Sequence, residues 1–302
     1  MMDGYAPFPL ETDDAAAGLA TTVSSGGGAT AVARHLPVRT SSRGTLFLHG
    51  AAGSWTTWTP LIAAAREAGT DLGEPVLFDL PGWGDAEADG NATVAIICDL
   101  VKDLALDLGY TEWDIVGHSM GGFIALHMAA LWPSSVTSVR MVSGTSHSVI
   151  DAVDHPWRGL HVIPGFVLFR AAMIAFSHVD RPVRALVRFL SRAHLLLPFV
   201  TPLFRHTLRV DSSVVRALGT ELRPRSFVAA TSVARGYDAD ALWSGIRCPV
   251  LATMGDRDVF VTSRDLSELR RIVPGARTTV IADCGHFGNV ERPREVLAAL
   301  FG

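Results

Sequence analysis

The sequence has few cysteines and no excess of basic residues. Its three cysteines, Cys98, Cys248 and Cys284, are too few and too scattered for a disulfide framework or a paired-cysteine zinc site. They fit a reducing compartment, so we expect the protein in the cytoplasm. The 26 basic and 30 acidic residues give a formal net charge of −4. This balance argues against a nucleic-acid-binding protein, because such proteins are usually basic.

Long apolar runs and a recognisable targeting segment are also missing. The longest apolar stretch, 159–177, is interrupted by Pro164 and Arg170, whereas a membrane-spanning helix needs about 20 mostly apolar residues. Residues 1–20 contain four acidic residues and no basic residue, unlike a secretory signal peptide. We therefore expect no transmembrane segment.

The chain does contain a regular alternation of strand and helix patterns. It follows residues 1–28, which we interpret as a flexible leader with a glycine-rich link at 24–28. Short apolar runs that suit buried strands lie at 45–49, 75–80, 113–117, 136–143, 249–255 and 277–282, and amphipathic helix patterns lie near 58–68, 93–108, 120–131, 263–272 and 291–301. Such alternation predicts an α/β fold with a mostly parallel sheet of about eight strands and helices on both faces.

The alternation stops between residues 146 and 245, and this break predicts an inserted α-helical cap. The stretch has helical runs interrupted by six prolines. The α/β core would then comprise 29–145 and 246–302. Residues 146–247 hold 13 arginines and 7 acidic residues. The simpler interpretation is that the arginines cover solvated helix faces. The alternative is that the cap docks on an anionic partner, such as an acyl-carrier protein, a substrate or a membrane surface.

The strongest functional pattern is Gly-His-Ser-Met-Gly-Gly at 117–122, directly after one predicted strand and before a predicted helix. In that position a G-x-S-x-G sequence is typical of a nucleophile elbow, a sharp turn that raises the serine above the edge of the sheet. We therefore predict Ser119 as a nucleophile. The amide of Met120 would face a developing oxyanion at the positive end of the helix.

A serine nucleophile needs a base and an acid that orients the base. On this scaffold the chain order is serine, acid, histidine. Asp256 and Asp258 follow the predicted strand at 249–255, and His286 follows the one at 277–282. The carboxyl ends of parallel strands share one edge of a sheet, so these side chains are expected to meet Ser119 there.

A second oxyanion donor is expected after an earlier strand, where small residues follow His49. Ala51 is the first choice of donor and Ala52 the second. His49 is expected to brace this loop by hydrogen bonding. The turn should direct His118 away from the serine, so neither histidine is predicted to be catalytic.

Five ordered motifs make the chain resemble the α/β-hydrolase superfamily, in the serine-nucleophile branch with a helical cap. They are HGAAGSWTTW (49–58), DLPGWGDAE (79–87), GHSMGG (117–122), GDRDVFV (255–261) and GHFGNVERP (285–293). The resemblance implies that Asp258 is the triad acid, with Asp256 as the fallback. It also implies that the cap lies over the active site. Thr262 departs from the family, which usually has a proline near this position.

The cap and the rim of the sheet suggest a hydrophobic substrate. The cap is crowded with phenylalanines, some of which are expected to line a pocket. The predicted pocket residues are Ala52, Trp55, Trp83, Phe166 and Phe169. No phosphate loop, dinucleotide fingerprint or metal-ligand spacing occurs in the sequence. We therefore expect no metal and no organic cofactor.

The leading functional hypothesis is a serine hydrolase of the carboxylesterase or thioesterase kind. It would act on a small hydrophobic acyl or aryl substrate, as an ester, thioester or lactone, through an acyl-enzyme. Two alternatives remain open at this point. The same triad serves carbon–carbon bond hydrolysis, elimination or cyclisation in some relatives, and other relatives bind a ligand as receptors without catalysis.

Overall fold

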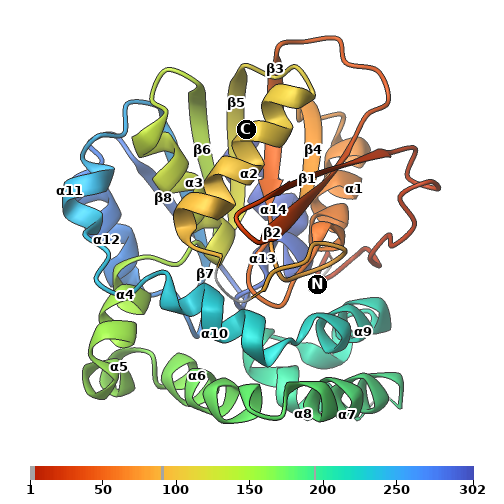
Figure 1. Cartoon of the computed structure of the whole chain (residues 1–302), viewed down its shortest axis with the longest axis vertical. Coiled ribbons are helices and arrows are strands. Elements are labelled where there is room, and N and C mark those ends of the chain that lie inside the picture. The colour runs from red at the N-terminus through yellow and green to blue at the C-terminus, as the bar shows by residue number, and fades with distance from the viewer. Residues whose placement is uncertain (1–3, 90–91, 194) are drawn as a thin grey trace.

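The computed structural model describes residues 4–89, 92–193 and 195–302. One sheet of eight strands forms its centre, in the order β1-β2-β4-β3-β5-β6-β7-β8 (Figure 1). The strands are β1 Ala20–Gly26, β2 Ala29–His35, β3 Arg43–Leu48, β4 Glu74–Asp79, β5 Glu112–His118, β6 Val136–Val142, β7 Val250–Gly255 and β8 Arg277–Ile281. β2 is antiparallel to β1 and β4, and the other pairs are parallel. The predicted α/β fold is confirmed.

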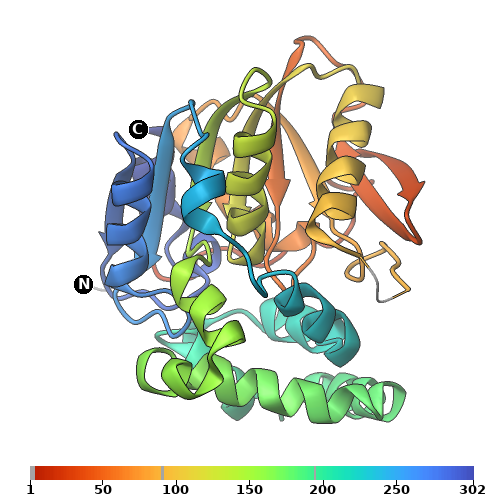
Figure 2. The ribbon, with the colours of Figure 1, turned by 60° about the vertical axis from the view of Figure 1, so that its left-hand side comes forward.

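Helices cover both faces of this sheet (Figure 2). On one face, α1 (Thr59–Ala68) packs with α14 (Pro293–Phe301) over a core that contains Phe47 and Val116. On the other face lie α2 (Val94–Asp107), α3 (Met120–Leu131) and α12 (Ser263–Ile272). α3 is almost entirely buried. Its packing fixes the position of Ser119, the residue before the helix, relative to the edge of the sheet.

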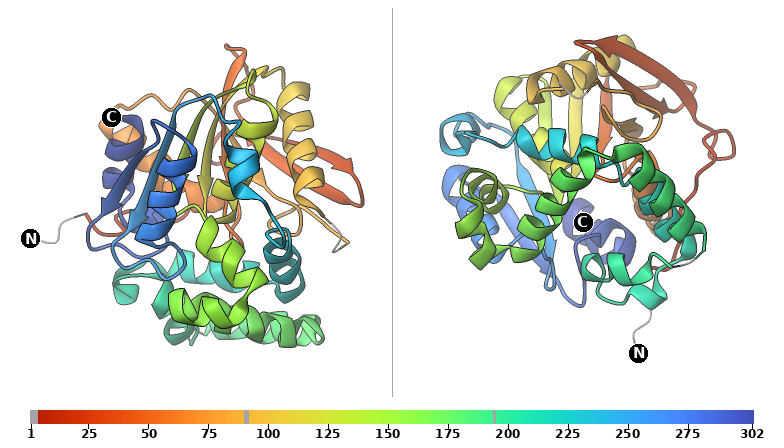
Figure 3. Two further views of the ribbon diagram at one scale, coloured as in Figure 1. Left: turned by 90° about the vertical axis from the view of Figure 1, so that its left-hand side faces the viewer. Right: turned by 60° about the horizontal axis from the view of Figure 1, so that its bottom comes forward.

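Between β6 and β7 the described residues form helices and no strand. These are α4 (His147–Asp154), α5 (Pro156–Val162), α6 (Pro164–Ser177), α7 (Asp180–Arg192), α8 (Leu197–Val200), α9 (Ser212–Glu221), α10 (Pro224–Ser232) and α11 (Ala239–Trp243), with short 3₁₀ turns at Thr201–Leu203 and Thr207–Arg209. α4 to α10 lie across the end of the sheet (Figure 3), whereas α11 packs on α3 of the core. No helix in the described part of the chain is long and apolar enough to cross a membrane.

The expected flexible leader is wrong for the part of it that the structure describes. β1 joins the sheet by pairing with β2 along its whole length, so 24–28 contains the end of a strand and a tight turn rather than a link. Upstream, Tyr5 is buried and donates a hydrogen bond from its hydroxyl to Glu291 Oε2 (2.7 Å). Residues 1–3 lie outside the described residues.

Candidate active site

Ser119 occupies a strained turn between β5 and α3. Its φ of 51° and ψ of −117° place a residue with a side chain in a backbone region that normally favours glycine. The turn can close only because its neighbours are glycines. A Cβ on Gly121 would lie 2.0 Å from the carbonyl oxygen of Leu48, and one on Gly117 would lie 2.3 Å from the carbonyl oxygen of Gly121. The G-x-S-x-G sequence is therefore a steric requirement of this elbow.

His286 is paired with Asp258 and not with Asp256. Its Nδ1 lies 2.9 Å from Asp258 Oδ1, and both side chains are almost completely buried. The same Oδ1 accepts hydrogen bonds from the amides of Phe260 (2.9 Å) and Val261 (3.1 Å), so the carboxylate is held in place. Because a carboxylate only accepts hydrogen bonds, Nδ1 carries the proton and Nε2 is left as the basic nitrogen.

Asp256 instead braces the histidine loop. Its Oδ1 accepts a hydrogen bond from the amide of Cys284 (3.0 Å), two residues before His286. Glu291 also holds this loop. Its carboxylate accepts hydrogen bonds from the amides of Gly285 (2.9 Å) and Phe287 (3.1 Å), the two neighbours of His286. Burial raises the pKa of Glu291. Together these acids fix the backbone on both sides of the histidine.

The two other histidines of the site have structural contacts. His49 Nε2 accepts a hydrogen bond from the amide of Leu80 (3.0 Å), so its Nδ1 is the donor to the carbonyl of Gly50 (2.7 Å). His118 lies 3.0 Å through Nε2 from the carbonyl oxygen of His286. Burial lowers the pKa of both rings, and for His118 the charge of His286 adds to the effect. Both rings are therefore uncharged at neutral pH, and each stabilises its loop through hydrogen bonds.

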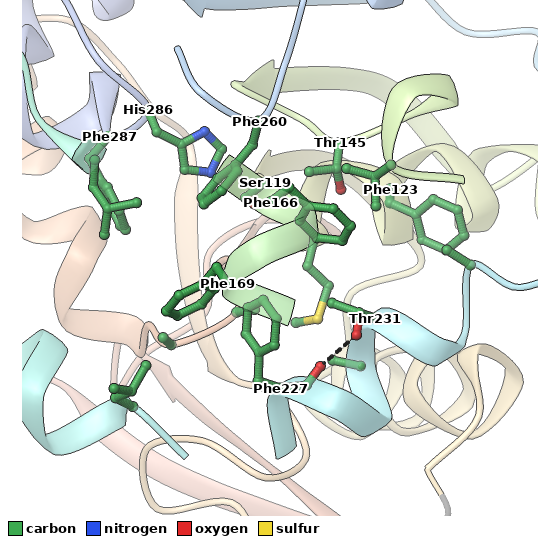
Figure 4. Close-up of a pocket in the computed structure, with 18 of the residues that line it drawn as sticks. Ser119, Phe123, Thr145, Phe166, Phe169, Phe227, Thr231, Phe260, His286 and Phe287 are labelled. Carbon is green, nitrogen blue, oxygen red and sulfur yellow. Dashed lines mark hydrogen bonds between the residues drawn. The ribbon is translucent and has the colours of Figure 1, made fainter. Parts of the chain in front are cut away.

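Ser119 and His286 lie in the lining of one cavity of about 130 Å³ (Figure 4). Ala51 and Met120, the predicted oxyanion donors, lie in the same lining. Met120 opens α3, so its amide is one of the first-turn amides that have no acceptor within the helix. A Cβ on Gly50 would lie 2.8 Å from the Cβ of Ser119, which shows how closely the loop after β3 approaches the serine.

The rest of this lining is strongly apolar. Among the described residues that form it, none is Asp, Glu, Lys or Arg. The predicted pocket residues Ala52, Phe166 and Phe169 belong to it. Sequence reasoning missed further aromatic members, which are Phe123, Phe227, Phe260 and Phe287. Phe260 and Phe287 were detectable in principle, since they stand within two residues of Asp258 and His286.

Trp55 and Trp83 do not line this cavity, and their predicted pocket role is wrong. Both are buried in the core. The amide of Trp55 donates to Asp79 Oδ1 (2.9 Å), and Arg34 stacks over its ring at 5.0 Å. Trp83 meets the ring of His49 edge-on, with 6.1 Å between the ring centres. Both tryptophans therefore support the loops behind the site.

The described residues contain no group of three or more His, Cys, Asp and Glu side chains placed to hold a metal ion.

Two aromatic rings contact the imidazole of His286. Phe260 meets its ring edge-on at 4.7 Å between centres, and Phe287 does so at 5.6 Å. An apolar surround of this kind excludes water from the Asp258–His286 hydrogen bond and strengthens it.

A family model described as "Alpha/beta hydrolase family" matches residues 45–300 of this chain. The esterase Rv0045c of Mycobacterium tuberculosis is 26% identical over 271 residues, which cover 85% of this chain and 81% of that protein. The pimeloyl-[acyl-carrier protein] methyl ester esterase of Neisseria meningitidis serogroup A is 28% identical over 226 residues, 74% of this chain and 65% of that protein.

Bifunctional epoxide hydrolase 2 of Mus musculus is 20% identical over 275 residues, which cover 82% of this chain. The chain spans about half of that protein's length, 49%. These relatives differ in their named reactions, so the assignment of a reaction to this chain depends on its own residues.

Proposed function

The chain belongs to the alpha/beta hydrolase family and is an enzyme of that family, and we propose that it is a serine hydrolase. The proposed substrate is a small hydrophobic ester, thioester or lactone. Ser119 would be the nucleophile, His286 the base and Asp258 the acid that orients it. The observation that carries this proposal is the buried Asp258–His286 hydrogen bond beside a strained serine, at one apolar cavity.

The proposed reaction has two stages. His286 Nε2 takes the proton of the Ser119 hydroxyl while the oxygen attacks the substrate carbonyl. The amides of Ala51 and Met120 donate hydrogen bonds to the resulting oxyanion, and each such donor typically lowers the barrier by about 2.7–4 kcal/mol. His286 then protonates the leaving alcohol or thiol. Water, activated by the same Nε2, releases the acyl group from Ser119.

The cavity supports an uncharged acyl or aryl group. A charged group buried among these side chains would have no partner, and its desolvation would cost several kcal/mol or more. The polar members of the lining other than Ser119 and His286 are Thr145, Ser146 and Thr231. The hydroxyls of Ser146 and Thr231 already donate within the protein, to Asp265 Oδ1 and to the carbonyl oxygen of Phe227, so they offer no donor to an ionised carboxylate.

The compartment and the acyl carrier are part of the same proposal. All three cysteines are free thiols, which supports a reducing compartment, and we propose the cytoplasm. One relative is named for an acyl-carrier-protein substrate. The substrate panel that tests the proposal therefore includes acyl thioesters alongside oxygen esters.

The test is the hydrolysis of p-nitrophenyl esters from acetate to palmitate and of the matching acyl thioesters, with Ser119→Ala beside the wild type. We expect the wild type to prefer one range of acyl lengths. Loss of the nucleophile should lower kcat by about 10⁶-fold while the circular dichroism spectrum is unchanged.

Three results would contradict the proposal. A folded wild type that is inactive on every member of the panel would indicate that the triad serves carbon–carbon bond hydrolysis, elimination or cyclisation. Tight binding of a small molecule without turnover would indicate a receptor. Equal activity in Ser119→Ala would remove the serine from the mechanism altogether.

A further inference from the structure

The outermost helices of the cap expose many large apolar side chains. α6 packs on α10 and α7 packs on α9, so α6 and α7, with α5 beside them, form the side of the molecule farthest from the sheet (Figures 1 and 3). We call the exposed side chains of these three helices the outer cap face. Its large apolar members include Trp157, Leu160, Leu168, Phe176, Leu186 and Phe189.

The exposure of these side chains is high. Trp157 and Leu168 are 63% exposed and Phe189 is 65% exposed. Tryptophan and phenylalanine exposed together with leucines on neighbouring helices form a kind of surface that monomeric proteins generally cover with a partner. On α6 the exposed positions are all apolar or small from Leu168 to Phe176.

The same face carries a large positive charge. α5, α6 and α7 contain six arginines, of which all but Arg170 are at least partly exposed, and one acidic residue, Asp180. Asp180 is buried and lies 3.7 Å from Arg184, so it does not neutralise the surface. Among the described residues, none forms an ion pair with the exposed arginines of α7, which are Arg181, Arg188 and Arg192.

The spacing on α7 places charge beside apolar surface. Arg181, Arg188 and Arg192 are separated by seven and four residues and share one side of the helix, and Leu186 and Phe189 lie on the adjoining side. An exposed Arg-rich edge next to a Trp-, Phe- and Leu-rich surface is the pattern of helices that lie in a lipid interface. The arginine heads would contact phosphate groups, and the apolar side chains would enter the acyl boundary.

We propose that the outer cap face docks on an anionic lipid surface. Two observations favour this occupant over other partners. A second copy of the chain would bring unpaired arginines against unpaired arginines, which is repulsive. An acidic carrier protein would pair with the arginines but would leave the exposed face of α6 uncovered, since that face has no charge. Docking of this kind needs no membrane-crossing helix.

The position of α6 also connects this surface with the cavity. Leu168 is on its exposed side, and its neighbours Phe166 and Phe169 line the cavity above Ser119. One helix thus separates the proposed lipid contact from the proposed acyl pocket. This consequence, delivery of an apolar substrate from the lipid, rests on the proposed function, whereas the docking itself does not.

The test is co-sedimentation with vesicles, using the Ser119→Ala protein so that hydrolysis plays no part. One vesicle type contains phosphatidylcholine alone, and the other contains equal parts of phosphatidylcholine and phosphatidylglycerol. We expect binding to the anionic vesicles only, weakened by added salt. Arg188→Gln with Arg192→Gln should weaken it by about fivefold for each arginine, and Leu168→Ser with Phe189→Ser by about tenfold or more.

The control removes one arginine and one apolar side chain from the core surface, with Arg66→Gln and Val38→Ser, both at exposed positions outside the cap. This control should bind as the parent does. The proposal is overturned if anionic and neutral vesicles bind equally, or if the cap variants bind as well as the control. It is also overturned if the protein sediments as a dimer that the Leu168 and Phe189 changes dissociate, or if an acidic carrier protein binds and vesicles do not.

Discussion

Asp256 and Asp258 stand two residues apart on the loop after β7, and their carboxylates have different partners. Asp258 Oδ1 accepts from His286 and two backbone amides, whereas Asp256 Oδ1 accepts from the amide of Cys284. We expect Asp258→Asn to lower kcat by about 10⁴-fold, because an amide facing Nδ1 favours the wrong imidazole tautomer. Steady-state kinetics with the preferred ester would measure this loss.

Asp256→Asn is the control for that change. Its side-chain oxygen still accepts from Cys284, so kcat should stay within a few-fold of the wild type. A large loss in Asp256→Asn with little loss in Asp258→Asn would exchange the two roles.

The burial of His118 predicts how the free energy of unfolding depends on pH. Burial holds the pKa of His118 well below the ordinary value of 6.5, so on acidification the unfolded chain takes up a proton there before the folded protein does. The stability associated with this group is present above pH 6.5 and is lost as the pH falls below it. We expect the free energy of unfolding of the wild type to fall between about pH 7.5 and pH 5 more steeply than that of His118→Gln.

Urea unfolding at the two pH values would measure this difference. The amide of glutamine still donates to the carbonyl of His286, and His49 remains in both proteins. Parallel slopes for the two proteins would mean that His118 takes up its proton over the same pH range in the folded and the unfolded state, so that burial does not lower its pKa.

At the level of single residues, the sequence is most informative where the order and spacing of residues along the chain determine their geometry. The order and spacing of the serine, the two aspartates and the histidine predict which strand ends carry them, and the preference for Asp258 over Asp256 comes from the family resemblance. The structure pairs Asp258 with His286. Pocket walls have no such pattern. The sequence predicts Trp55 and Trp83 as pocket residues, but both are buried in the core, where a tryptophan removes a large apolar surface from water.

At the level of elements, β2 was missed although it is buried, whereas strands β3 to β8 and the amphipathic helices of the core were predicted within a few residues. Their apolar side chains repeat with the period of the element, so the sequence carries the signal. β1 was missed because it is an edge strand with half-exposed residues. Its hydrogen bonds join it to β2 through the backbone, and backbone pairing leaves no mark on side-chain periodicity.

The contacts between the cap helices predict which residues determine the preferred acyl-chain length of the substrate. Phe169 on α6 meets Phe227 on α10 edge-on, with 4.9 Å between ring centres, at the far side of the cavity from His286 (Figure 4). We expect Phe169→Ala to enlarge the cavity and shift the preferred p-nitrophenyl ester to a longer acyl chain. Phe176→Ala, on the same helix but 42% exposed, should leave the preference unchanged. A shift in both variants or in neither would remove Phe169 as a length determinant.

In the molecule as a whole, the N-terminal segment joins the core to the cap. The Tyr5 hydroxyl donates to Glu291 and accepts from the amide of His206, which precedes the 3₁₀ turn at Thr207–Arg209. We expect Tyr5→Phe to lower the free energy of unfolding by about 1–3 kcal/mol. The reason is that Glu291 Oε2 and the backbone amide of His206 each lose a hydrogen-bond partner. Urea titration would measure the change.

The control for Tyr5→Phe is Thr21→Val, which removes an exposed hydrogen bond to Asp14 in the same segment. This change should alter stability by less than about 0.5 kcal/mol. A loss in Tyr5→Phe as small as the one expected for Thr21→Val would mean that the Tyr5 hydroxyl contributes little to the packing of the cap on the core.

The central claim is that Ser119 forms a covalent acyl-enzyme with the help of His286. Its most direct test is labelling with an alkyl fluorophosphonate, in which the serine oxygen attacks phosphorus and fluoride leaves, followed by mass spectrometry of the intact protein and its peptides. The account predicts one phosphonyl group on the peptide that contains Ser119, no label in Ser119→Ala, and much slower labelling in His286→Ala. An unlabelled Ser119 in folded protein, or a label on another residue, would contradict it.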